Sequence, residues 1–300
     1  MIAIQVCTLF ILMPNVSVII PTFNRAHLIE ESVSSVLSQT FKPKEVIVVD
    51  DGSNDKTWDV LKNLGFSVSE TQKKSLRYIY KENGGVSSAR NIGIELSSSE
   101  YVALLDSDDQ WKPTKLEAQL SSLKKESFSC RVSHTNEIWI RNGIRVNQHK
   151  KHGKNGGDLF EKCLKMCCIS PSSALIHRSV FNDLGGFDES LKACEDYDFW
   201  LRYCAFEQTH FVNEQLTIKN GGHSDQLSQM YWGMDRFRIF SLEKLLKNKN
   251  LSRSKYKLAL TELILKLKIL MNGSMKRGKK DFTDELNKKI NHFESLLDNE

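Results

Sequence analysis

Short apolar runs alternate with helical patterns through the first third of the chain, and this alternation most limits the possible folds. Four runs have the length of buried strands, at 16–20, 45–49, 76–80 and 101–105. Between them, apolar residues recur at helical spacing over 29–37, 58–64 and 87–96. Buried strands that alternate with amphipathic helices are typical of right-handed βαβ units. The sequence therefore predicts an α/β fold with an open, mainly parallel sheet flanked by helices.

The pattern changes after Leu120. Segments 131–135, 137–140, 144–146 and 173–176 are predicted strands, with a hairpin turn at Asn142–Gly143. Segments 158–166 and 196–205 are predicted helices, and 150–157 is a loop rich in Gly and Lys. We divide the chain into an apolar extension at 1–13, a main domain at 14–230 with halves at 14–125 and 126–230, and a helical C-terminal region at 231–300.

Charge and cysteine content narrow the possible partners. The formal net charge is +5, and Lys and Arg are dense only after Lys244, which favours a solvated helical face over attraction to anionic lipid or an acidic acceptor. We expect no nucleic acid partner. Among the seven cysteines, Cys163, Cys167 and Cys168 have neither the spacing nor the histidine partners of a zinc site. Buried free thiols in a reducing cytoplasm fit this pattern, so we expect a cytoplasmic protein, with attachment to the inner face of the membrane as an alternative left open.

The N-terminal apolar stretch, residues 2–13, is too short to span a bilayer, and no basic residue precedes it as in a signal peptide. The segment Met13–Asn15 directly precedes the first strand and would make a natural start, so our hypothesis is that residues 1–12 are an upstream extension or a wrongly assigned start. No run of eighteen apolar residues occurs elsewhere, and no transmembrane helix is expected.

Polar side chains follow each of the four predicted strands. They are Thr22, Asn24 and Arg25; Asp50 and Asp51; Asn83, Gly84 and Gly85; and Asp106 and Asp108. Ligands of open α/β sheets bind beyond the carboxyl ends of the strands, so these residues are expected to meet at one crevice. Asp106 and Asp108 point the same way along extended backbone and could hold Mg²⁺ or Mn²⁺. The triplet Asp106, Asp108 and Asp109 alone equally fits a solvated acidic turn before a helix starting near Pro113–Thr114.

Two common nucleotide-binding motifs are missing. No G-x-G-x-x-G follows the first strand, and no G-x-x-x-x-G-K-[ST] occurs in the chain. Dinucleotide-binding Rossmann domains and P-loop nucleotidases are therefore disfavoured. Carboxylates stand at these strand ends instead, which indicates diphosphate binding assisted by a metal ion.

Six motifs in order resemble those of glycosyltransferase family 2, which has the GT-A fold. They are Val18–Arg25, Val48–Ser53, Asn83–Gly85 with Ala89–Asn91 and Gly93, Leu105–Asp109, Gly185–Asp188, and Glu195–Asp198. The resemblance extends from about Val16 to about Gln229. It implies a nucleotide site that includes Thr22, Asn24, Arg25, Asn83, Asp51 against the base, Arg90 toward the diphosphate, and Asp106 at the ribose.

The resemblance also assigns the chemistry. Asp108 would touch the metal, Mn²⁺ or Mg²⁺, with Asp106 and His223 in its shell, and Asp196 would be the general base. Gly185, Gly186, Phe187, Glu195 and Trp200 would line the pocket for acceptor and sugar. The implied reaction is an inverting transfer of one sugar from a nucleoside diphosphate sugar, most commonly a UDP-sugar, to a glycan or lipid-linked acceptor in the synthesis of a cell-surface polysaccharide or glycoconjugate. The C-terminal helices could serve acceptor selection, a homodimer or peripheral membrane contact, and the sequence leaves these three open.

Each assignment has a structural alternative. Asp196 could be a helix N-cap, Arg90 could pair with Glu82 or Glu95, and His223 could be an ordinary loop residue. Gly185–Gly186 could cap a helix, while Trp111 and Trp200 could be core or pocket wall.

Three other functions are alternatives to this one. The first is a non-catalytic scaffold that binds sugar nucleotides on the same fold. The second, a sugar-1-phosphate nucleotidyltransferase, would need a Gly-rich loop with Lys or Arg after the first strand, where Pro21–Arg25 stands instead. The third, a processive synthase, would need transmembrane helices and usually a Q-x-x-R-W element, and neither is found in the sequence.

Overall fold

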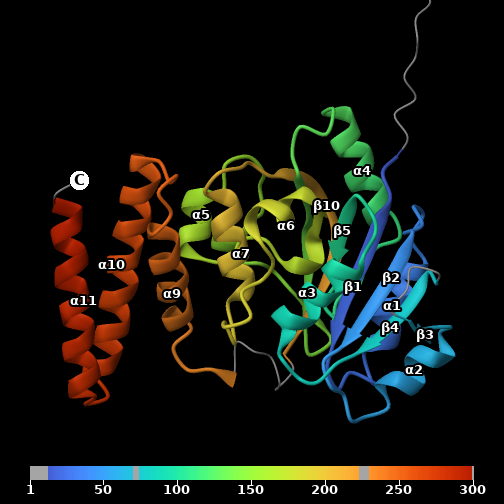
Figure 1. Cartoon of the computed structure of the whole chain (residues 1–300), viewed down its shortest axis with the longest axis horizontal. Coiled ribbons are helices and arrows are strands. Elements are labelled where there is room, and N and C mark those ends of the chain that lie inside the picture. Colours follow the sequence, from blue (N-terminus) through green and yellow to red (C-terminus); the bar gives the residue numbers. More distant parts are fainter. Residues whose placement is uncertain (1–12, 70–73, 223–229, 299–300) are drawn as a thin grey trace, which may run out of the picture.

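The computed structural model describes residues 13–69, 74–222 and 230–298, and a ten-stranded sheet forms its right-hand part in Figure 1. The strand order is β3-β4-β2-β1-β5-β9-β7-β10-β6, and β8 pairs with β7. Strands β3, β4, β2, β1 and β5 are mutually parallel, whereas β9 runs antiparallel to both β5 and β7. The predicted mainly parallel sheet flanked by helices is confirmed.

The first half follows the predicted order closely. Its elements are β1 (Val16–Thr22), α1 (Ile29–Leu37), β2 (Glu45–Asp50), α2 (Thr57–Asn63), β3 (Ser67–Val68), β4 (Leu76–Tyr80), α3 (Val86–Leu96) and β5 (Tyr101–Leu104). Side chains of β1 alternate between two cores. Ile19 packs with Val102 and Ala89, and Val18 and Ile20 pack with Val33 of α1.

The second half differs more from the prediction. Its elements are β6 (Gln110–Trp111), α4 (Lys115–Lys125), β7 (Val132–Arg141), β8 (Ile144–Val146), α5 (Phe160–Lys165), β9 (Ala174–His177), α6 (Ser179–Leu184), α7 (Glu195–Cys204) and β10 (His210–Gly221), with 3₁₀ turns at Lys150–His152 and Pro171–Ser173. The two strands predicted at 131–135 and 137–140 form one strand, β7. The hairpin is confirmed, since Asn142 and Gly143 both have positive φ.

Strand β10 has no counterpart in the prediction although it is twelve residues long. It runs parallel to β7, and its register shifts between Val212 and Gln215 and again between Gln215 and Thr217. Three exposed polar residues, Asn213, Glu214 and Gln215, occupy this irregular stretch. A bulge interrupts the two-residue alternation of side chains, and this interruption hides the strand from sequence analysis.

The C-terminal region is helical as predicted, with α9 (Asp235–Leu246), α10 (Arg253–Met275) and α11 (Lys280–Asp298). Helix α9 packs on α7, α10 packs on α5 and α9, and α11 packs on α10, so these helices extend the molecule away from the sheet (Figure 1). Leu242, Leu263 and Leu286 belong to the same buried cluster as Phe160 and Phe199. Their apolar faces therefore continue the main core. No helix within 13–69, 74–222 or 230–298 has both the length and the apolar character that crossing a membrane requires.

Candidate active site

The carboxyl ends of β1, β2 and β5 meet at one edge of the sheet, toward the lower end of the molecule in Figure 1. Thr22 ends β1 and is 2% exposed; within the described chain its Oγ1 has no hydrogen-bond partner. Its carbonyl oxygen accepts the N–H of Asp51 at 2.8 Å. The predicted nucleotide residues after β1 and β2 are thus brought together.

Asn24 and Arg25 connect the loop after β1 to the loop after β2. Asn24 has a φ of 52°, a left-handed conformation that asparagine adopts more readily than most residues. Its N–H donates to Ser53 Oγ at 2.8 Å, and its Oδ1 accepts the N–H of Asn54 at 2.9 Å. Its side chain therefore shapes the site, and a nucleotide contact stays a prediction. The positive charge of Arg25 lowers the pKa of Asp108.

Asp51 organises the loop that follows β4. One carboxylate oxygen accepts Lys81 Nζ at 2.6 Å and the N–H of Gly84 at 2.9 Å, and the other accepts the N–H of Gly85 at 2.7 Å. The Asn83 amide donates to the carbonyl of Asp51 at 2.9 Å. A carboxylate offers about four acceptor sites, so the predicted hydrogen bond from a base would use the one that remains.

Arg90 joins the two halves of the site. We predicted that it faces the diphosphate, or that it pairs with Glu82 or Glu95. Instead its guanidinium is 3% exposed and donates to Asp106 Oδ1 and to Glu195 Oε1, each at 2.7 Å. Burial alone would lower its pKa, but these two carboxylates raise it, so Arg90 stays charged. Arg90 therefore positions Asp106 and Glu195, and it presents little surface to a ligand.

Asp108 lies close to two other carboxylates, Asp106 and Asp109. Burial and the neighbouring charge of Asp106 raise its pKa, while Arg25 and Lys219 lower it. Its backbone carbonyl accepts the Asn220 amide at 2.7 Å, but its carboxylate has no side-chain partner in the described parts of the chain. Two carboxylates two residues apart at a strand end provide the hard oxygen donors that Mg²⁺ and Mn²⁺ prefer.

These two side chains therefore fit a divalent cation, which would relieve their mutual repulsion. Within the described ranges, no cluster of three or more His, Cys, Asp or Glu side chains is arranged to hold a metal. His223, the predicted additional ligand, lies outside those ranges. The fit consequently rests on Asp106 and Asp108 alone.

Asp109 has a structural role that the sequence did not reveal. Its carboxylate is 2% exposed, accepts Ser172 Oγ at 2.6 Å and accepts the N–H of Asn220 at 2.9 Å. Ser172 also receives the N–H of Asp106 at 3.1 Å. Burial and the charge of Asp108 hold the pKa of Asp109 well above its usual range. Ser172 and Asp109 together fix the acidic turn against β10.

Asp196 lies in the first turn of α7 and is partly exposed. Its Oδ1 accepts the N–H of Tyr197 at 2.7 Å, and its Oδ2 accepts the thiol of Cys167 at 3.1 Å. The N-cap position belongs to Cys194, whose φ is 61°, so the alternative in which Asp196 is the N-cap is wrong. The carboxylate is held by two donors and is paired with no cation in the described structure.

The predicted acceptor pocket needs correction. Trp200 is fully buried against Phe199, so it belongs to the core and has no face free for a sugar. Phe187 is 3% exposed and stacks on Phe199 at 4.7 Å. Gly185 ends α6 with a φ of 75°, which confirms the helix-cap alternative for this glycine.

Gly186 packs against the side chain of Asn91. A Cβ on Gly186 would lie 2.3 Å from Asn91 Oδ1. The Asn91 amide bonds the backbone of Phe187 in both directions, at 2.8 and 2.9 Å. Of the predicted pocket, Glu195 remains at the site, through its pair with Arg90.

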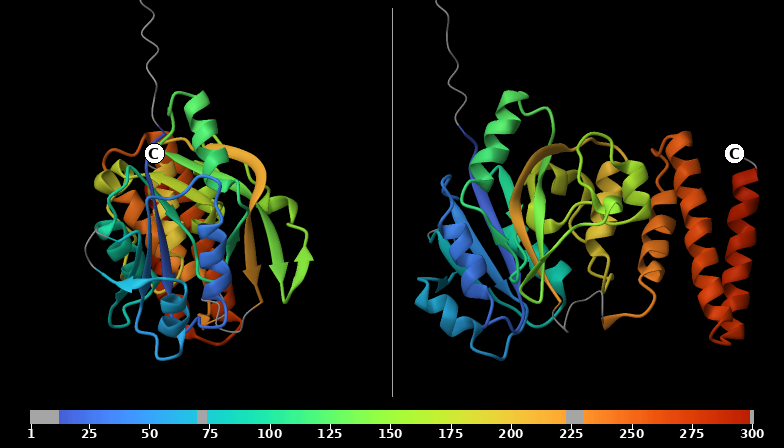
Figure 2. Two further views of the ribbon diagram at one scale, coloured as in Figure 1. Left: turned by 90° about the vertical axis from the view of Figure 1, so that its right-hand side faces the viewer. Right: turned by 180° about the vertical axis from the view of Figure 1, so that it is seen from behind.

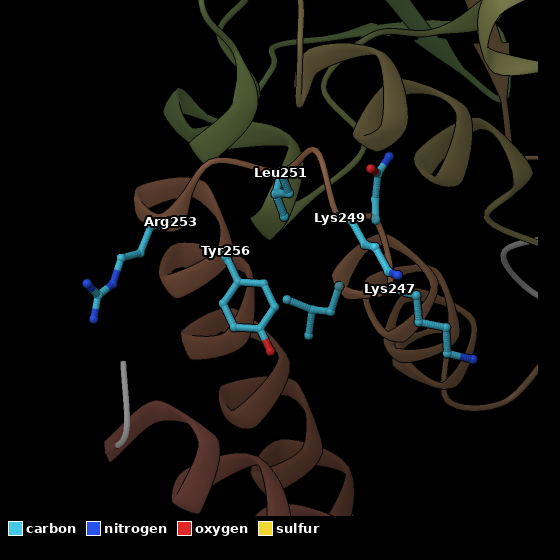
Figure 3. A pocket seen from close by; sticks show the side chains of 7 residues that line it. Lys247, Lys249, Leu251, Arg253 and Tyr256 are labelled. Atoms are coloured by element: carbon cyan, nitrogen blue, oxygen red, sulfur yellow. The ribbon is translucent and has the colours of Figure 1, made fainter.

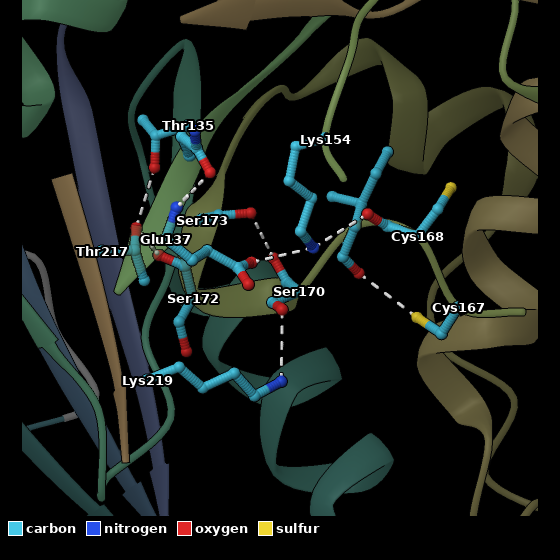
Figure 4. A network of polar contacts seen from close by, with 12 residues as sticks. Thr135, Glu137, Lys154, Cys167, Cys168, Ser170, Ser172, Ser173, Thr217 and Lys219 are labelled. Atoms are coloured by element: carbon cyan, nitrogen blue, oxygen red, sulfur yellow. Dashed lines mark hydrogen bonds and ion pairs between the residues drawn. The ribbon is translucent and has the colours of Figure 1, made fainter. Parts of the chain in front are cut away.

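A buried ionic network includes Glu137, Lys154 and Lys219, and sequence analysis missed it (Figure 4). Glu137 of β7 pairs with Lys154 at 3.0 Å, and Lys219 of β10 donates to Ser170 Oγ at 3.2 Å. Burial alone would raise the pKa of Glu137, but Lys154 and Lys219 lower it to about 2. Burial alone would lower the pKa of Lys219, but the charges of nearby carboxylates raise it, so Lys219 keeps its charge; these carboxylates are Asp109, Glu137, Asp106 and Asp196. Recognition of β10 as a strand would have indicated that Lys219 faces the site.

Comparison with known proteins places this geometry in a family. The model of glycosyl transferase family 2 matches residues 17–185. An uncharacterized glycosyltransferase of Rickettsia typhi is 35% identical over 217 residues, which cover 71% of this chain and 65% of that protein. The match thus spans slightly less than two thirds of that relative.

Two further matches agree. The Escherichia coli UDP-Glc:alpha-D-GlcNAc-diphosphoundecaprenol beta-1,3-glucosyltransferase WfgD is 33% identical over 187 residues, covering 62% of this chain and 68% of that protein. The crystal structure of S. aureus TarS 1-349 in complex with UDP-GlcNAc superposes with a TM-score of 0.66 at 21% identity, covering 83% of this chain and 71% of that one. The last likeness concerns the fold. The chain therefore belongs to glycosyltransferase family 2 and has the GT-A fold.

Proposed function

We propose that this protein transfers a single sugar, with inversion, from a nucleoside diphosphate sugar to a glycan or lipid-linked acceptor in the synthesis of a cell-surface polysaccharide or glycoconjugate. A UDP-sugar is the proposed donor, because WfgD is named for UDP-Glc and TarS was solved with UDP-GlcNAc. The observation that carries the proposal is the Arg90 bridge. It ties Asp106, on the nucleotide side, to Glu195, the residue next to Asp196.

The proposed reaction needs one base and no protein nucleophile. Asp196 takes the proton of the acceptor hydroxyl while that oxygen bonds to the anomeric carbon from the face opposite the diphosphate. The bond between the anomeric carbon and the diphosphate oxygen breaks, its electron pair leaves with the nucleoside diphosphate, and the anomeric configuration inverts. A divalent cation held by Asp106 and Asp108 would neutralise the charge that develops on the leaving group.

The surroundings of Asp196 favour its role as base. Hydrogen bonds from Tyr197 N–H and the Cys167 thiol orient its carboxylate, and it lies beside the Arg90–Glu195 pair. Asp198, two residues on, is fully buried and pairs with Arg202 at 2.8 Å and Lys244 at 2.7 Å. Of these two aspartates in the first turn, Asp196 alone retains exposed surface.

A panel of donors tests this proposal. The thermal midpoint of the purified protein is measured with UDP-, GDP- and dTDP-sugars, with and without Mn²⁺, for wild type, Asp108→Asn and Asp196→Asn. Asp284→Asn, an exposed carboxylate on α11, is the control. A ligand stabilises the state that binds it, so one nucleotide class should raise the midpoint.

The variants separate the two roles. Asp108→Asn should lose the metal-dependent shift, and Asp196→Asn should keep the shift but lose donor hydrolysis and transfer. NMR of the product sugar should report inversion. Donor binding without any turnover in wild type would favour the scaffold function. Full turnover by Asp196→Asn would exclude this residue as the base.

A further inference from the structure

Large apolar side chains are exposed at one end of the C-terminal helices. Met230 is 60% exposed, Trp232 53% and Met275 59%. Trp232 precedes α9, and Met275 is the last residue of α10. Exposed apolar groups scattered singly need no explanation, but their grouping with charges marks an interaction surface.

Two cations contact Trp232, and further cations follow Met275 in the chain. The guanidinium of Arg236 lies 3.7 Å from the centre of the Trp232 ring, and Lys279 Nζ lies 4.4 Å from it. The turn between α10 and α11 adds Lys276, Arg277 and Lys280, all exposed. In the chain segments that the structure describes, none of the five forms an ion pair with a carboxylate. We call this surface, made of Met230, Trp232, Arg236, Met275, Lys276, Arg277, Lys279 and Lys280, the basic-aromatic patch.

The basic-aromatic patch lies at the same end of the molecule as the candidate active site. The parallel strands β1 and β2 point their carboxyl ends downward in Figure 1, and the start of α9 and the α10–α11 turn also lie at the lower end. The view from behind in Figure 2 shows the same arrangement. A flat surface that contacted the patch would therefore face the edge of the sheet that carries Asp106 and Asp108.

We propose that the basic-aromatic patch docks the protein on the anionic surface of a lipid bilayer and so holds the active site near a lipid-linked acceptor. This inference rests on the proposed function. Tryptophan prefers the interface between lipid and water, and lysine and arginine are attracted to anionic headgroups. The cations stacked on Trp232 would stay in the headgroup layer while its ring enters the boundary below. The charge of the patch and its exposed Trp and Met match such a surface and favour it over a neutral protein partner.

The opposite end of the same helices provides a matched control. A cavity of about 490 Å³ at the α9–α10 turn is lined by Lys247, Lys249, Arg253 and Tyr256 (Figure 3). Both lysines are exposed, as in the patch, but this turn lies at the upper end in Figure 1, away from the site edge. Replacing two lysines at either end lowers the net charge by the same amount. The two double variants therefore differ only in where the positive charge is lost.

The test is sedimentation of the full chain with vesicles of phosphatidylglycerol and phosphatidylcholine in equal parts, and with phosphatidylcholine alone. Wild type should bind the anionic vesicles, and added salt should weaken this binding. Each Lys or Arg near an anionic surface raises the affinity for it about fivefold, so K276Q/K280Q should bind the anionic vesicles about 30-fold more weakly than wild type. K247Q/K249Q should bind like wild type. Trp232→Ala should weaken binding even at high salt, because an apolar contact is not screened.

Several results would overturn the inference. They are no binding of wild type to anionic vesicles, equal binding to both vesicle types, and equal losses in the two lysine pairs. Equally tight binding to a soluble polyanion such as heparin, with the same dependence on Lys276 and Lys280, would point to a polyanionic partner instead.

Failure of the docking inference is distinguishable from failure of the proposed function. The donor-induced thermal shift and donor hydrolysis do not require a membrane, and K276Q/K280Q should retain both. If wild type shows these activities but ignores vesicles, only the docking inference fails. If it binds vesicles through the patch but recognises no donor, the proposed function fails.

Discussion

Replacing Arg90 with glutamine is expected to destabilise the fold and to make its stability depend strongly on pH. The guanidinium is 3% exposed and bonds both Asp106 and Glu195 at 2.7 Å. Glu195 is itself 7% exposed, so its charge would lose its partner inside the protein. Removing one member of a buried pair costs about 3–5 kcal/mol. For a chain of 300 residues, such a loss lowers the midpoint of thermal unfolding by roughly 5–8 °C.

The pH dependence separates the loss of charge from the loss of packing. Burial raises the pKa of Glu195 in the folded protein, and Arg90 counteracts this rise. Without Arg90, the folded pKa of Glu195 rises further above the unfolded value of about 4.3. The folded variant then binds this proton more tightly than the unfolded chain, so the contribution of Glu195 to stability is most favourable below a pH of about 4.3. As the pH rises toward the folded pKa, stability falls by up to about 1.4 kcal/mol per pH unit.

The assay is urea unfolding of wild type and Arg90→Gln, followed by tryptophan fluorescence at several pH values from 4.5 to 8. The difference in unfolding free energy should be small at the acidic end and should grow with pH. The double variant Arg90→Gln/Glu195→Gln should be less destabilised than the sum of the two single variants. A difference that is already complete at pH 4.5 and constant above it would refute the electrostatic explanation and indicate lost packing.

Three other substitutions test neighbouring features. Asp108→Asn should be at least as stable as wild type near pH 7, because burial and Asp106 raise the pKa of Asp108, and its thermal shift with Mn²⁺ should disappear; an unchanged shift would exclude Asp108 as a ligand. Gly93→Ala should lower the free energy of unfolding in urea by about 1–3 kcal/mol, since a Cβ would lie 2.3 Å from Ile19 Cγ2. The double variant Gly93→Ala/Ile19→Ala should lose less stability than the sum of the two single variants, because Ile19→Ala removes the clash. Cys167→Ala should lower kcat about fivefold with KM unchanged, because it removes a donor to Asp196 Oδ2, and Cys167→Ser should restore most of the rate; equal rates in all three would show that the thiol does not position the base.

The fold of the first half was predictable because local and tertiary preferences agree there. Residues 45–50 and 76–80 are mainly apolar, strand-like and bounded by polar turns, and they form β2 and β4 in parallel register. Each buried strand needs cover on both faces, and the helical stripe around Val33 supplies it on one side. The order of elements alone therefore predicts this part of the sheet.

The second half was less predictable because its pairings are distant in sequence. Strand β10 bonds to β7, which lies about 80 residues earlier, and to β6, about 110 residues earlier. Its bulged, polar middle carries no alternating pattern, and partners from elsewhere in the sheet stabilise it. A short stretch of sequence around β10 therefore does not reveal its partner strands.

The residues of the candidate site were predictable by type, but their interaction partners were not. The sequence alone, through its motifs, identified the strand-end carboxylates Asp106 and Asp108 and the acidic start of α7, because carboxylates next to apolar runs are conspicuous. Only the tertiary structure decided that Arg90 joins Asp106 to Glu195 and that Trp200 lies in the core. It also decided that Asp109 has a structural role, through its hydrogen bond with Ser172. The physical reason is that the sequence determines which groups carry charge, whereas the packing of distant segments determines which counter-charge each group meets and how much water reaches it.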